Sequence, residues 1–88
     1  MIVIEASALV DALVHAYRNE RFVFVIGNGG SAAMASHFAC DLGKGTVEEG
    51  KPRFKVLSLT DNVPLLTAYG NDFGYDVVFA EPLASLAQ

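Results

Sequence analysis

The feature that most constrains the fold of this 88-residue chain is the run FVFVIGNGGS at residues 22–31. Its apolar, β-branched and aromatic first half predicts a buried strand over Phe22–Ile26. Glycines then dominate residues 27–30, and glycine permits positive φ and a close approach of the backbone to a ligand. The alanine-rich stretch that follows predicts a helix from about Ala32 to Leu42, with Ser31 as its N-cap.

A strand, a glycine loop and a helix N-terminus in this order are typical of an anion site. The first N–H groups of a helix have no partner inside it, and the helix dipole adds partial positive charge there. The pattern therefore predicts that a phosphate group binds at Gly27–Ser31. The loop is neither a P-loop, because no Gly-Lys-Ser/Thr follows, nor G-x-G-x-x-G, because residue 32 is alanine. We expect no nucleotide cofactor.

The other elements follow from periodicity and turn residues. A second strand is expected over Phe54–Leu59, parallel to the first because a helix connects the two. The remaining expectations are an amphipathic helix from about Ile4 to Arg18, the end of the second helix at Gly43–Gly45, a helix over 63–69 with Pro64 in its first turn, a turn over 70–74, and helical spacing over 75–88 interrupted at Pro82. The predicted class is α/β, in the order helix-strand-helix-strand-helix-helix.

Two parallel strands are too few for a sheet with both faces covered. We expect residues 1–88 to form the N-terminal half of a doubly wound parallel sheet, completed by further residues or by another chain. The hydrophobic fraction of 52% agrees with this, since so short a chain buries only a modest core. Partner subunits are a second way to cover those apolar faces.

Charge and cysteine content narrow the class of partner and the compartment. The net charge of −4 argues against a nucleic-acid partner. A single cysteine, Cys40, fits a reducing cytoplasm. The first ten residues form neither a signal peptide nor a bilayer span, so we expect no membrane partner.

Polar residues near the two strand ends are candidates for chemistry. Thr60–Asn62 and the glycine loop both follow strands, so they can face one ligand at the carboxyl edge of the sheet. His37 and Asp41 share a helix face, which fits a general acid–base pair, part of a metal site completed elsewhere, or a simple surface contact. Asp61 is alternatively an N-cap, and Asn71-Asp72 a pair of turn formers.

Two long segments together resemble one known family. GNGGSAAMASHFACDLGKG, followed by SLTDNVPLLTAYGNDFGYDVVFAEPL, resembles the sugar isomerase (SIS) domain, and within it the phosphoheptose isomerase branch. The resemblance implies a flavodoxin-like α/β fold in a cytoplasmic homotetramer. It also implies interconversion of sedoheptulose 7-phosphate and D-glycero-D-manno-heptose 7-phosphate, a step of heptose biosynthesis in carbohydrate metabolism.

The resemblance also assigns roles to individual residues. Asp41 stands where the family has a glutamate that acts as general base, and His37 matches a histidine that binds zinc in some members. Asp41 is one methylene shorter than that glutamate, and Met34 replaces an acidic residue, so both departures bear on catalysis. The residues that match the family's sugar phosphate site are Asn28, Gly29, Gly30, Ser31, Asp61, Asn71 and Asp72.

Three hypotheses remain at this point. In the first, the complete protein is an isomerase with Asp41 as base, His37 as acid–base or polar partner, and zinc held by His37 and Asp41. In the second, the protein is a non-catalytic phosphosugar-binding or scaffold member of the family. In the third, the chain is an inactive truncated product. The family's serine-rich phosphate loop and its later catalytic histidine would follow Gln88, so this chain alone is expected to be inactive.

Overall fold

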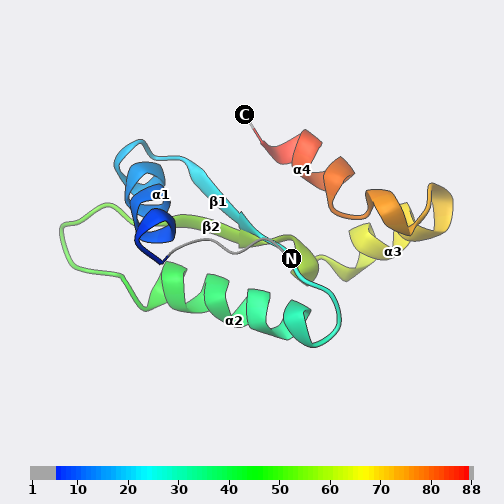
Figure 1. The fold of residues 1–88 in the computed structure, drawn as a ribbon, viewed down its shortest axis with the longest axis horizontal. Coiled ribbons are helices and arrows are strands. Elements are labelled where there is room, and N and C mark those ends of the chain that lie inside the picture. The colour runs from blue at the N-terminus through cyan, green and yellow to red at the C-terminus, as the bar shows by residue number, and fades with distance from the viewer. Residues whose placement is uncertain (1–5, 88) are drawn as a thin grey trace.

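The computed structural model describes residues 6–87 and shows two strands, four α-helices and two short 3₁₀ helices (Figure 1). The elements are α1 (Ala6–Arg18), β1 (Phe22–Val25), α2 (Gly30–Lys44), β2 (Lys55–Ser58), η1 (Leu59–Asp61), α3 (Val63–Asp72), η2 (Tyr75–Val77) and α4 (Ala80–Leu86). The predicted order of strands and α-helices is confirmed. The expected start of the first helix at Ile4 lies outside the described residues, as does Gln88.

The two strands pair in parallel, and α2 connects them. Phe22 lies opposite Lys55 and Val25 opposite Ser58, so both strands end at the same edge of the sheet. Figure 1 shows α2 running alongside both strands. The helix lies close to β2, as the position of Gly43 shows: a Cβ placed on it would be 3.1 Å from Cγ1 of Val56. The predicted α/β class with a parallel sheet is confirmed.

The prediction that the first strand is buried is wrong. Phe22 is 47% exposed, and Ile26, which follows the strand, is 54% exposed. Among residues 6–87, the buried apolar side chains are Ala35, Leu59, Val78 and Pro82. The physical reason is coverage: a parallel strand is buried when helices lie on both faces of its sheet, and within residues 6–87 the sheet has only two strands.

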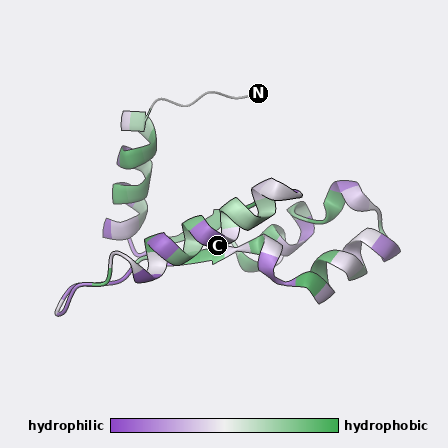
Figure 2. Cartoon of the chain, turned by 90° about the horizontal axis from the view of Figure 1, so that it is seen from below, coloured by the Kyte–Doolittle hydropathy of each residue, from purple (hydrophilic) through white to green (hydrophobic). Residues whose placement is uncertain are grey.

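Helix α1 shows the same lack of cover. Figure 2 shows it projecting from one end of the molecule, with hydrophobic residues along its length, while Tyr17 in its last turn contacts Phe54. Leu9 and Val10 are 46% and 55% exposed. Amphipathic spacing therefore predicts this helix correctly, while the apolar side chains on one of its sides stay exposed and available for contacts with other protein. Among residues 6–87, no helix is both long enough and apolar enough to span a membrane.

Several predicted boundaries after α1 are wrong. Helix α2 includes Gly43 and Lys44, and Gly45 stays in right-handed geometry instead of forming a left-handed cap. Helix α3 continues through Asp72, so residues 70–72 are helical and the turn is confined to Phe73 and Gly74. The helical stretch predicted over residues 75–88 is interrupted between η2 and α4, before Pro82 and not at it. Pro82 itself lies in the first turn of α4, where proline is tolerated.

Asn62, not Asp61, caps α3. The Asn62 side-chain oxygen accepts a hydrogen bond of 3.1 Å from the Leu65 N–H, and its carbonyl accepts from Leu66. Asp61 belongs to η1, so its alternative role as the cap of this helix is wrong. Pro64 lies in the first turn of the helix, as predicted.

We expect Asn62→Ala to lower the free energy of unfolding by about 1 kcal/mol, because it removes this capping oxygen. The measurement is chemical denaturation of the full-length protein. Asn62→Asp keeps the acceptor and is the matched control. An equal loss in both variants would contradict the capping role.

Candidate functional site

The glycine loop is a tight turn that leads directly into α2. Gly29 has φ 55° and ψ −125°, a conformation that suits glycine at the first central position of a type II′ turn. The Ser31 N–H donates a hydrogen bond of 2.9 Å to the Asn28 carbonyl and closes that turn. The Ala32 N–H donates to the Gly29 carbonyl at 3.0 Å. Backbone hydrogen bonds therefore connect the turn directly to the first turn of α2.

Gly27 is required for a steric reason. A Cβ placed on Gly27 would overlap the carbonyl oxygen of Ser31 in the first turn of α2. Gly30 differs, since a Cβ placed there meets nothing within 4 Å. Gly27 and Gly29 therefore hold the loop geometry for different reasons, while the backbone makes no such demand at Gly30.

The prediction that Ser31 is the N-cap is wrong. The helix begins at Gly30, its N-cap is Gly29, and no side chain accepts a capping hydrogen bond there. The turn supplies backbone carbonyls to the Ser31 and Ala32 amides, so those two N–H groups are already bonded. Among the described residues, the amides of Gly29 and Gly30 make no backbone hydrogen bond. These two amides therefore remain available to an anion at the start of α2.

A pocket of about 560 Å³ opens beside this loop. Its volume lies within the range of small-molecule sites. Its lining comes from four parts of the chain: the loop and the start of α2, η1, α3, and η2 with the residues after it. The lining residues are Gly27, Asn28, Gly29, Ala32, Thr60, Leu66, Thr67, Gly70, Asn71, Tyr75, Val78 and Phe79. The pocket therefore joins both predicted loops at the carboxyl edge of the sheet.

The pocket contains some of the predicted site residues and not others. Asn28, Gly29 and Asn71 line it. Gly30 and Ser31 lie at the start of α2 outside its lining, and both are exposed. The other acidic candidates also lie elsewhere. Asp61 lines a neighbouring pocket of about 600 Å³ between α2 and β2, and exposed Asp72 accepts a hydrogen bond of 3.2 Å from the Asn71 side chain.

Asn71 and Asp72 are not turn formers, because α3 includes both. Residues in the pocket that the sequence analysis missed include Thr67 and Tyr75. Thr67 and Asn71 are four residues apart, so they share one face of α3. Because glycine is unfavourable inside helices, Gly70 led us to predict a turn at residues 70–74, and the helical spacing of Thr67 and Asn71 was not recognised.

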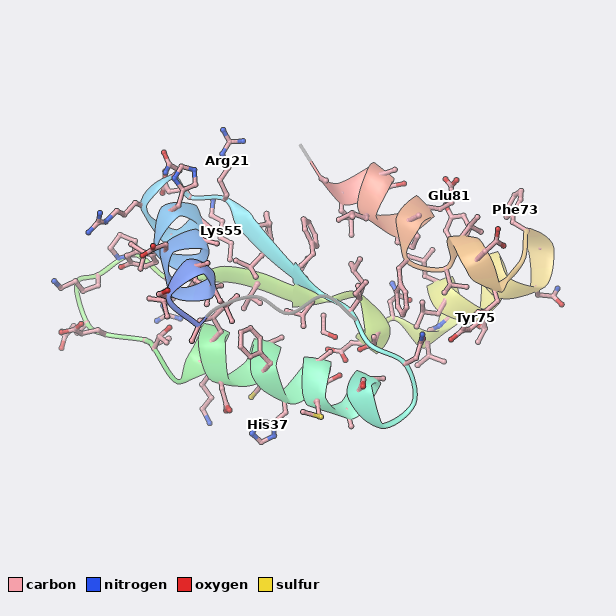
Figure 3. The ribbon with its side chains drawn as sticks, viewed as in Figure 1. Arg21, His37, Lys55, Phe73, Tyr75 and Glu81 are labelled. Atoms are coloured by element: carbon pink, nitrogen blue, oxygen red, sulfur yellow. The ribbon has the colours of Figure 1, made fainter. Side chains whose placement is uncertain are left out.

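His37 and Asp41 form a pair on the outer side of α2. Nε2 of His37 lies 3.1 Å from Oδ2 of Asp41, and the two side chains are 79% and 69% exposed. Figure 3 shows His37 pointing away from the two strands. Neither residue lines the pocket beside the glycine loop. The two features that the sequence singles out are therefore separate in this part of the protein.

This pair does not form a complete zinc site. Within residues 6–87 no group of three His, Cys, Asp or Glu side chains is arranged to hold a metal ion. Structural and catalytic zinc sites have at least three protein ligands. The donor set of two therefore does not fit zinc unless other parts of the protein contribute ligands.

The geometry defines a class: an α/β chain with a glycine loop and a pocket at the carboxyl edge of a parallel sheet. The sequence pattern of the SIS domain matches residues 4–88, so the chain belongs to the SIS domain family.

Curated relatives and a solved structure agree with this placement. Phosphoheptose isomerase from a Bradyrhizobium species is 40% identical over 81 residues, which cover 92% of this chain and 40% of that protein. Phosphoheptose isomerase from Sulfurimonas denitrificans is 43% identical, covering 96% of this chain and 41% of that protein. The structure of phosphoheptose isomerase from Neisseria gonorrhoeae aligns with a TM-score of 0.80 at 32% identity, covering 93% of this chain and 41% of that one.

The chain thus spans about 40% of the length of the curated relatives that it matches. The similarity covers the glycine loop and the pocket, because it extends over nearly the whole of this chain. The expected SIS fold is confirmed by the family match and by the structural alignment.

Proposed function

We propose that the protein containing this chain is a phosphosugar isomerase that interconverts sedoheptulose 7-phosphate and D-glycero-D-manno-heptose 7-phosphate. The observation that carries the proposal is the glycine loop, which opens α2 and lines a pocket large enough for a sugar phosphate. Relatives at about 40% identity that bear the name phosphoheptose isomerase support the choice of sugar.

The Gly29 and Gly30 amides and the positive end of α2 would hold the phosphate. Asn28 and Asn71 carry amide side chains that suit the hydroxyl groups of a sugar. Isomerisation then needs a base that moves a proton between C1 and C2 through an enediol. We propose Asp41 as this base. Its carboxylate lies outside the pocket on this chain, so the role requires that the complete protein bring C1 and C2 of the substrate within hydrogen-bond reach of Asp41. His37, paired with Asp41, would orient that carboxylate.

A second function has an observation in its favour. Asp41 is largely exposed and does not line the pocket, which agrees with a protein that binds a phosphosugar without converting it. One experiment separates the two functions. The full-length protein is mixed with sedoheptulose 7-phosphate, while binding is measured by calorimetry and the aldose product by chromatography. Binding of the sugar phosphate with formation of the aldose supports the isomerase. Binding without the aldose supports a protein that binds the phosphosugar without converting it, and absence of binding rejects both functions.

We also propose that the protein acts in the cytoplasm as a homotetramer, as the family resemblance implies. The exposed apolar residues Leu9, Val10 and Val14 on α1 support further protein contacts at this helix. Sedimentation equilibrium of the full-length protein tests the number of subunits. Zinc stays a prediction that needs ligands beyond His37 and Asp41, and dialysis of the full-length protein against zinc tests it.

A further inference from the structure

A chain of polar side chains links the end of β2 to α2. Oγ of buried Ser58 lies 2.6 Å from Oγ1 of Thr60, which in turn lies 3.4 Å from Oγ of Ser36. The Ser36 hydroxyl donates a hydrogen bond to the carboxylate of Asp61. The network thus joins residues that are more than 20 positions apart in the sequence, at the turn where β2 passes into η1.

The Asp61 carboxylate is the acceptor at one end of this network. An ionised carboxylate only accepts hydrogen bonds, whereas a hydroxyl has one hydrogen to donate. When the Ser36 hydrogen is directed to Asp61, the Ser36 oxygen can accept from Thr60. The Thr60 hydrogen has two acceptors within reach, the Ser36 oxygen and the Ala32 carbonyl, and with either one the Thr60 oxygen can accept from Ser58. One acidic group therefore ends a network of three hydroxyl groups.

The same network contacts the wall of the pocket from outside. The Ser36 and Thr60 hydroxyls lie 3.1 Å and 3.4 Å from the carbonyl oxygen of Ala32. Thr60 and Ala32 both line the pocket beside the glycine loop, although they belong to different elements. Ser36 and Asp61 do not line it, and they face the neighbouring pocket instead.

We propose that Asp61 and Ser36 are positioning residues, which hold the Thr60 wall of the sugar phosphate pocket against the first turns of α2 without touching the ligand. The choice of ligand rests on the proposed function, whereas the network itself does not. This assignment replaces direct contact between Asp61 and the substrate, which the family resemblance implied.

The test uses Ser36→Ala, Asp61→Ala and the double variant of the full-length protein, with sedoheptulose 7-phosphate as substrate. We expect each single variant to raise KM about tenfold, the size of a lost hydrogen bond to a charged group, with little change in kcat. The double variant should be no worse than either single variant, because both break the same connection. Ser36→Thr retains a hydroxyl and should restore KM.

The matched control is Ser85→Ala in α4, since the Ser85 hydroxyl bonds only to the Glu81 carbonyl four residues earlier. It should leave KM unchanged. If Asp61→Ala fails to fold, Asp61→Asn keeps an acceptor oxygen and should give a smaller rise in KM. Lower thermal stability with unchanged KM would overturn the proposal, as would additive effects of the two substitutions.

A second measurement keeps the inference separate from the proposed function. If the unmodified protein shows no turnover, the proposed isomerase fails, and amide hydrogen exchange then decides the positioning role. Ser36→Ala and Asp61→Ala should both speed exchange in residues 27–32 relative to Ser85→Ala. Unchanged exchange in that segment would overturn the inference.

Discussion

Gly27→Ala is expected to disrupt the glycine loop and to weaken sugar phosphate binding by tenfold or more. The new Cβ would overlap the carbonyl oxygen of Ser31, which belongs to the backbone of α2 and has no rotamer that avoids the clash. Either the loop or the start of the helix must shift, and a displacement of about 1 Å in a site costs roughly a hundredfold in rate. Calorimetric titration of the full-length protein with sedoheptulose 7-phosphate measures the binding loss.

The same substitution should also lower the free energy of unfolding, by about 1–3 kcal/mol, as overpacked sites do. Gly30→Ala is the matched control for stability, because the added Cβ meets nothing within 4 Å and the backbone φ there is not positive. It should unfold at the same denaturant concentration as the unmodified protein or a higher one. An equal loss from both substitutions would show that the Ser31 carbonyl is not the cause.

Local signals in the sequence were sufficient to predict the core of this fold. The apolar run before Gly27 and the helix-forming run after Ser31 define one strand–helix unit, and the parallel pairing with the second strand follows from the helix that connects the two. Pro64 marks the start of α3 through its fixed φ, whereas residue type alone did not distinguish Asn62 from Asp61 as the capping acceptor.

The errors arose where tertiary contacts decide the structure. Gly70 suggests a turn, yet it is helical, and a Cβ placed on it would lie 3.5 Å from Val78. The packing of Val78, which follows η2, on α3 places Asn71 in the pocket wall, which no local pattern indicates. Ser31 was assigned as a cap from its residue type, but the backbone turn at Gly29 fills that role.

The candidate site could be predicted only in part. The glycine loop was found because its chemistry is local, and the pairing of His37 with Asp41 follows from helix spacing. The network at Asp61 was missed, since it depends on Ser36, a residue 25 positions earlier in the sequence. The resemblance assigns Asp61 to the substrate site from its position after β2, and that role stays a prediction.

Replacing Asp41 by alanine is expected to have the largest effect on activity. Positioned general bases contribute about 10²–10⁴-fold to proton transfer, so Asp41→Ala in the full-length protein should lower kcat by that range. The affinity for sedoheptulose 7-phosphate should change little, because Asp41 does not line the pocket beside the glycine loop. Product formation and calorimetric titration on the same preparation measure the two quantities.

Asp11→Ala, an exposed acidic residue on α1, is the matched control and should keep both quantities. Asp41→Glu restores the methylene that the family's base has, so it should retain or raise kcat if the carboxylate acts on the substrate. A kcat that survives Asp41→Ala would exclude Asp41 as the base. Sugar phosphate binding would then be independent of the His37–Asp41 pair. This result would agree with the structure, in which neither residue of the pair lines the pocket.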